Sequence, residues 1–314
     1  MRRIKIAVAI AAFGAALSLH AGAAYAKDGM AAQPSQIADQ ARASLAKDIA
    51  AWKTSHPEAF EAVRNVTGHK PEVYSKQRNP IPVVGRELRR LGPVALLPML
   101  EALAFEAPAR EGATDQEWTA LTVGMLEAVG VLRDPRSGPV LRAIFEGGSA
   151  NAQVLRAAAV GMGQLGGDAE LSALIKHSAA GDPLRAAAIE GLGNCRRLES
   201  AKHLASLLRT ASDEVSAELL GKAIGRVASS WAWKAMGPAA EQEGIAVREV
   251  AAKALVAGFV RFGGQARAEM RRGLLMAEHR ETPELLAKAR PSVDAKTASE
   301  LDSLSAQLNR VAKR

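Results

Sequence analysis

The sequence predicts an all-α fold, an α-solenoid of antiparallel helix pairs. The main observation is an internal repeat: between residues 111 and 260, an apolar residue followed by a small one recurs about every 32 positions. The repeated steps are Val129-Gly130, Met162-Gly163, Leu192-Gly193, Ile224-Gly225 and Leu255-Val256. Repeats of this length form stacks in which each unit buries its apolar face only against its neighbours.

The second observation is the spacing inside each unit. Apolar or small residues stand four and eight positions before most of the steps, as at Val154 and Ala158, and such positions share one face of an α-helix. A further apolar residue follows eleven positions after the small one, at Leu141, Leu174, Leu204 and Met236. Each unit is therefore predicted to be a helix, a tight turn and a second helix.

Residues 1–26 have the pattern of a cleaved signal peptide. A basic start with Arg2 and Arg3 precedes the apolar stretch 6–19, and Ala-Tyr-Ala at 24–26 supplies a small-x-small cleavage sequence. Because a membrane span needs about 20 residues, we expect no integral span after cleavage. An uncleaved anchor helix is the alternative, and twin-arginine export is an alternative to general secretory export. The prediction is an exported protein, periplasmic or secreted.

Residues 27–82 are predicted to form an N-terminal helical cap followed by a proline-rich connector. Apolar residues at spacings of three and four predict an amphipathic helix that starts near Gln36. A second helix carries Phe60 and Val63. The connector holds prolines that exclude a regular helix: Pro71, Pro80 and Pro82.

The rest of the chain divides into two predicted parts, the repeat solenoid at 83–282 and a C-terminal capping helix at 283–314. A capping box of Thr297 and Glu300 is expected to start that last helix. The helix closes the stack, because an end repeat must expose one face to water. Docking on a partner is the alternative role for it.

Three units share a pattern close to V-R-x-x-A-x-x-A-L-G. They are VLRAAAVGMG at 154–163, LRAAAIEGLG at 184–193 and VREVAAKAL at 247–255. This pattern resembles HEAT repeats, and most of all the short HEAT-like repeats of the phycobiliprotein-lyase (PBS lyase) type. The resemblance implies a right-handed stack of antiparallel helix pairs whose inner surface binds other proteins. It does not extend to lyase activity, because those enzymes act on cytoplasmic light-harvesting proteins and this chain carries an export signal.

The charge distribution argues against a nucleic-acid partner. The whole chain has 41 Lys+Arg and 33 Asp+Glu, a formal net charge of +8. The repeat core at 111–245 is slightly acidic, whereas both flanks are basic. A nucleic-acid binder built on repeats would line the solenoid itself with Lys and Arg. Binding of an anionic envelope polymer through the basic flanks stays an alternative.

No sequence motif of catalytic or cofactor chemistry stands in its required context. Glycines at 161–166 match the dinucleotide fingerprint G-x-G-x-x-G, but they close a predicted helix instead of following a strand. HEAT-type hydroxylases bind iron through His-Glu dipeptides, and this sequence has only Glu278-His279 in reverse order. Cys195 follows the repeat glycine Gly193, where we expect a small buried thiol. We therefore predict no cofactor, no metal and no catalytic residue.

Partner-binding candidates follow from the resemblance, since in such solenoids the second helix of each unit lines the concave face. Its outward positions are Arg136, Arg142, Lys176, His177, Lys202 and Arg209. Trp231 joins them, because the repeat register places Trp233 in the core and Trp231 on the surface. An exposed tryptophan is a frequent interface anchor. Filling of a gap beside the unit that carries Ser216 is the alternative role of Trp231.

These observations predict a non-enzymatic scaffold or adaptor of the bacterial cell envelope that binds another protein on its concave face. The alternative is a metal-dependent enzyme whose site is assembled across repeats. The sequence leaves the partner's identity and the oligomeric state open.

Overall fold

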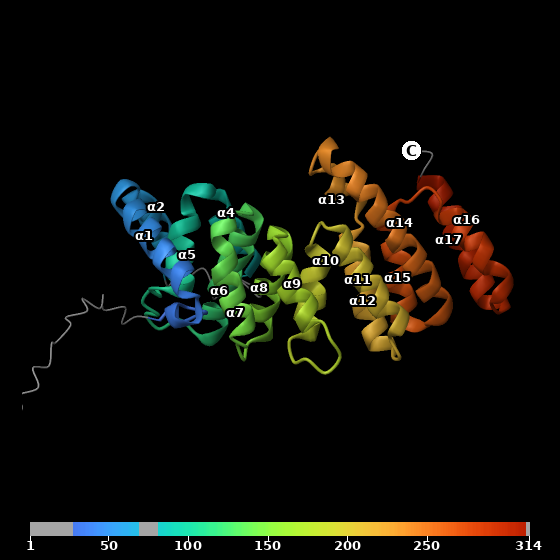
Figure 1. Ribbon diagram of the computed structural model, residues 1–314, viewed down its shortest axis with the longest axis horizontal. Helices are drawn as coiled ribbons and strands as arrows, with labels where there is room; N and C mark the ends of the chain where they lie inside the picture. Colours follow the sequence, from blue (N-terminus) through green and yellow to red (C-terminus); the bar gives the residue numbers. More distant parts are fainter. Residues whose placement is uncertain (1–27, 69–80, 312–314) are drawn as a thin grey trace, which may run out of the picture.

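The computed structural model describes residues 28–68 and 81–311, and the statements below refer to these ranges. The predicted signal peptide and most of the predicted connector lie outside them. Within them the chain is built from helices and contains no β-strand, so the predicted all-α solenoid of antiparallel helix pairs is confirmed (Figure 1). No helix in these ranges combines the length and apolar character needed to cross a membrane.

The helices form two layers along the stack. The first layer contains α4 (Ile81–Arg90), α6 (Asp115–Leu132), α8 (Ala152–Leu165), α10 (Arg185–Asn194) and α12 (Glu214–Val227). The second layer contains α5 (Leu96–Ala104), α7 (Gly138–Glu146), α9 (Asp168–His177) and α11 (Leu198–Thr210). Short 3-10 helices precede two of them: η2 (Pro93–Ala95) and η3 (Pro135–Ser137).

The small residue of each repeat lets first-layer helices approach to backbone contact. A Cβ built on Gly163 of α8 would lie 2.0 Å from the carbonyl oxygen of Gly191 in α10, and one on Gly130 would lie 2.8 Å from the Cα of Gly161. By contrast, α7, α9 and α11 of the second layer touch one another sparsely. First-layer helices are therefore packed more closely along the stack than second-layer helices.

The order of the layers changes after α12. The next helix, α13 (Ser230–Lys234), has only 5 residues and cannot fill the place beside α11. That place is taken by α14 (Pro238–Arg261), and α15 (Gly264–Ala277) packs on α12 in the first layer. The predicted register of 247–255 as a first-layer helix is therefore wrong. Its small residues allow close packing in either layer, so the pattern alone does not distinguish them.

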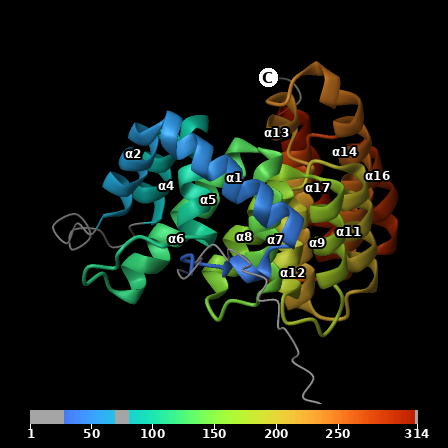
Figure 2. The same cartoon turned by 60° about the vertical axis from the view of Figure 1, so that its left-hand side comes forward.

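Helices at the N-terminal end cover the first units. The chain enters through η1 (Pro34–Gln36), α1 (Asp39–Ser55) and α2 (Pro57–Thr67), and Figure 2 shows α1 crossing α5. The segment before η1 is held on α5, because the backbone N–H of Met30 donates to the carbonyl of Ala102 over 2.9 Å.

Helices α16 (Thr282–Ala289) and α17 (Ala295–Val311), joined by η4 (Arg290–Ser292), close the other end. The predicted capping box of Thr297 and Glu300 is not formed. Asp294 caps α17 instead, its Oδ1 accepting from the backbone N–H of Thr297 over 3.0 Å. Glu300 accepts from Nη1 of Arg267 on α15 over 3.0 Å, an interaction between helices that replaces the local one.

Candidate binding surface

Three of the predicted partner-binding residues are engaged in contacts within the fold. Arg136 forms a two-bond pair with Asp134, at 3.0 Å from Nε to Oδ1 and 2.7 Å from Nη2 to Oδ2, and these bonds hold the pKa of Asp134 below its usual value. Arg142 of α7 pairs with the buried Glu170 of α9. His177 lies 2.9 Å from Asp182, measured from Nδ1 to Oδ2. These three side chains stabilise loops and neighbouring repeats.

The other three predicted cations are exposed and have no ion pair within the described residues: Lys176, Lys202 and Arg209. Lys176 lies on α9, away from the other two. Lys202 and Arg209 lie on α11 and are brought to one groove. All three lie on the second layer, as expected for the second helix of each unit. That this layer lines a concave face stays a prediction.

The groove has a volume of about 590 Å³ and runs between α11 and α14. These helices are parallel. At one end the N–H of Leu198 donates to Oε1 of Glu243 over 2.7 Å, and at the other Nη1 of Arg261 donates to the carbonyl of Arg209 over 2.8 Å. Largely covered residues form the floor: Leu208, Val250, Ala254, Gly258 and Phe262. Exposed basic residues form the rim: Lys202, Arg209, Lys253 and Arg261.

The α14 side of this groove was missed by the sequence reasoning. Lys253 and Arg261 belong to the helix whose register was assigned to the first layer, so they were not considered as neighbours of Lys202 and Arg209. No local signal in the sequence corrects this. The shortness of α13, which forces α14 into the second layer, becomes visible only in the structure.

Two tryptophans of α13 have opposite environments, as the repeat register predicts. Trp233 is 0% exposed, and its Nε1 donates to the carbonyl of Val227 over 2.7 Å. Trp231 is 78% exposed. A side chain that filled a gap between repeats would be covered by them, so the exposure of Trp231 rules out the gap-filling role. Figure 1 shows α13 at the upper edge of the molecule.

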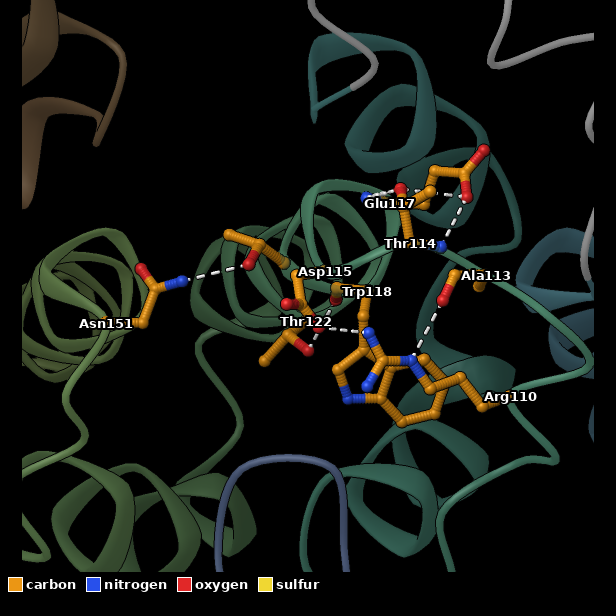
Figure 3. A network of polar contacts seen from close by, with 9 residues as sticks. Arg110, Ala113, Thr114, Asp115, Glu117, Trp118, Thr122 and Asn151 are labelled. Carbon is orange, nitrogen blue, oxygen red and sulfur yellow. Dashed lines mark hydrogen bonds and ion pairs between the residues drawn. The ribbon is translucent and has the colours of Figure 1, made fainter.

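A polar network at the start of α6 serves the fold (Figure 3). Thr114 and Glu117 form a capping box, with the backbone N–H of Thr114 donating to Oε2 of Glu117 over 2.7 Å. Arg110 in the preceding loop pairs with Asp115. Asn151, at the start of α8, donates to a hydroxyl of α6 over 2.9 Å. These contacts satisfy a helix end and join neighbouring helices.

Cys195 is buried, as predicted, and burial raises the pKa of its thiol to about 11. Because the thiolate is the reactive form, we expect no labelling of the folded protein by a disulfide reagent in mildly alkaline buffer. Complete labelling is expected once guanidinium chloride unfolds the chain, measured by the absorbance of the released thiolate. Rapid labelling of the native protein would contradict the buried placement.

Carboxylates that are buried in the solenoid hold repeats together. Glu190 of α10 lies 2.5 Å from Nε of Arg156 on α8 and 3.6 Å from Nη1 of Arg226 on α12. It therefore bridges three consecutive first-layer helices.

Across residues 28–68 and 81–311, no three His, Cys, Asp or Glu side chains form a group suited to a metal ion. The glycines of the fingerprint-like motif lie in α8 and at its end, where Gly166 has a φ of 69°.

Comparisons with known proteins give a similar structure and no family. No family model matches the sequence, and no curated protein matches it. Among solved structures, the chain is similar to human deoxyhypusine hydroxylase in complex with glycerol. The identity is 13%, the match covers 82% of this chain and 96% of that chain, and the TM-score is 0.30. The described residues form an α-solenoid of antiparallel helix pairs.

The prediction of a non-enzymatic chain requires correction in view of this comparison. The similar structure is that of a hydroxylase, so the prediction of a non-enzymatic chain is not kept. At this level of identity the similarity concerns the fold alone. It transfers no reaction, substrate or metal to this chain.

Proposed function

We propose that this HEAT-like chain is an exported protein that binds another protein of the cell envelope, with Trp231 as an anchor of the interface. The observation that carries the proposal is the 78% exposure of Trp231. Burial of a large apolar side chain is worth about 1.5–3 kcal/mol, and the isolated chain does not gain it at this position. A complex in which a partner covers the indole gains this free energy. Export is supported by the signal-peptide pattern at 1–26, and the repeat type by the V-R-x-x-A pattern.

The helix that carries Trp231 is held firmly, which favours recognition. Trp233 of the same helix is buried in the core, and the hydroxyl of Ser230 donates to Oε2 of Glu278 over 2.7 Å. Lys234 approaches the same carboxylate, at 3.4 Å from Nζ to Oε2. An exposed indole on a fixed helix loses little conformational entropy on binding, and such pre-organised aromatic anchors dominate interface energies.

The test is a cross-linked pull-down of the mature protein from its native envelope fraction, read by mass spectrometry. We expect one stoichiometric partner with the wild type and its loss with Trp231→Ala, since truncation of a hot-spot residue costs about 2 kcal/mol or more. Val215→Ala is the matched control, because Val215 is 79% exposed at the start of α12. Retention of the partner by Trp231→Ala, or recovery of no partner by the wild type, would refute the proposal.

A further inference from the structure

The groove between α11 and α14 combines an apolar floor with four cations, only one of which has an acidic partner within the described residues. Three rim residues form no ion pair within the described residues: Lys202, Arg209 and Arg261. The fourth, Lys253, lies 2.6 Å from Glu249, from Nζ to Oε1. The guanidinium of Arg261 donates to the main-chain carbonyls of Arg209 and Ala211 at the C-terminal end of α11, which do not neutralise it. A ligand for this groove therefore needs an apolar surface and negative charge.

The positions of the cations indicate the shape of that ligand. Lys202 and Arg209 are seven residues apart on α11, which corresponds to about 10 Å along the helix axis. Lys253 and Arg261 are eight residues apart on α14, or about 12 Å. Because the two helices are parallel, the two lysines flank one end of the floor and the two arginines flank the other. A fatty acid carries its charge at a single end, whereas this groove offers positive charge at both.

We propose that the groove between α11 and α14 binds an acidic amphipathic α-helix of a partner protein. The apolar stripe of that helix lies on the floor, and carboxylates two turns apart meet the cations at the two ends. Residues seven apart on a helix project from the same face, so one helix can present both the stripe and the carboxylates. The inference rests on the proposed protein-binding function but uses a surface separate from Trp231.

The experiment is a selection from a display library of helical peptides roughly 18 residues long, with a constant Leu/Ala stripe and randomised flanking positions. The mature wild-type protein is the target, at low salt. We expect enriched peptides to carry Asp or Glu at flanking positions seven apart. Enrichment of neutral or basic peptides, or of none, would overturn the proposal.

Variants then test the site with the most enriched peptide, by fluorescence anisotropy. The double variant Lys202→Glu/Arg209→Glu is expected to weaken binding by about tenfold or more, through repulsion of the peptide's carboxylates. Ala257→Trp, at an exposed groove position, is expected to block binding sterically. Lys176→Glu is the matched control, an exposed cation on α9 outside the groove, and should leave the affinity unchanged. Circular dichroism melts confirm that each variant is folded.

The outcomes separate this site from the Trp231 interface. Equal affinity of wild type and the double variant would overturn the groove proposal. The proposal would also be overturned if the groove bound sodium oleate but no peptide, and if the double variant weakened that oleate binding. A partner that depends on Trp231 while no peptide is enriched leaves the proposed function standing and removes the groove. Peptide binding with no partner lost in Trp231→Ala removes the Trp231 interface and keeps the groove.

Discussion

Replacement of Trp233 by Ala is expected to lower the free energy of unfolding by about 3–5 kcal/mol, the largest single-residue effect on stability that we predict. Trp233 is 0% exposed, and its indole N–H donates to the carbonyl of Val227 over 2.7 Å. A Cβ on Gly244 would lie 2.9 Å from its Cδ2, which shows how closely α14 packs on the ring. The substitution removes this packing and leaves the carbonyl unpaired. Urea denaturation followed by circular dichroism measures the change.

The neighbouring tryptophan provides the matched control for this measurement. Trp231→Ala changes a 78% exposed side chain and should alter the free energy of unfolding by no more than about 0.5 kcal/mol. Similar losses of stability in the two variants would show that the repeat register does not separate a core tryptophan from a surface one.

The second large effect is expected at the contact between first-layer helices. Gly163→Ala should cost about 2–3 kcal/mol, because its Cβ would lie 2.0 Å from the carbonyl oxygen of Gly191. The obstacle is backbone, so α8 and α10 must move apart, and each of them packs on a further helix of the same layer. Thermal and urea denaturation give the size of the loss.

Gly221→Ala is the control for Gly163→Ala. At Gly221, within α12, the nearest atom to a built Cβ is Cγ of Met270 at 3.2 Å, a flexible side chain that can adjust. Since Ala favours the helix over Gly by about 1 kcal/mol, we expect unchanged or increased stability. A Gly163→Ala variant as stable as wild type would mean that first-layer helices are not in backbone contact.

Regular repeats were predicted well because their information is local and repeated. The spacing that places Val154 and Ala158 on one helix face also buries them, and the recurring small residue predicts a site of close approach, as at Gly163. The burial of Trp233 and Cys195 followed from the same register. The same hydrophobic spacing recurs in several units, and it therefore predicts which side chains pack inward.

Predictions that rested on a single occurrence of a short sequence pattern were less successful. Thr297 and Glu300 have the residues of a capping box, but Glu300 forms an ion pair with Arg267 of α15, 33 positions away. The unit at 247–255 has repeat residues, but α14 packs in the second layer. In both cases a partner distant in sequence competes with the local pattern, and its position is decided only when the chain is folded.

The sequence by itself determined the all-α class, the helix pairs of the solenoid, and the exposure of Trp231 next to a buried Trp233. These properties depend on hydrophobic periodicity, which each segment carries in its own residues. Only the tertiary structure decided the layer of each helix, the pairing of Arg136, Arg142 and His177 within the fold, and the groove between α11 and α14. The groove forms because α13 is too short to pack along α11, and the longer α14 occupies that position. This arrangement brings cations from two distant segments around one apolar floor.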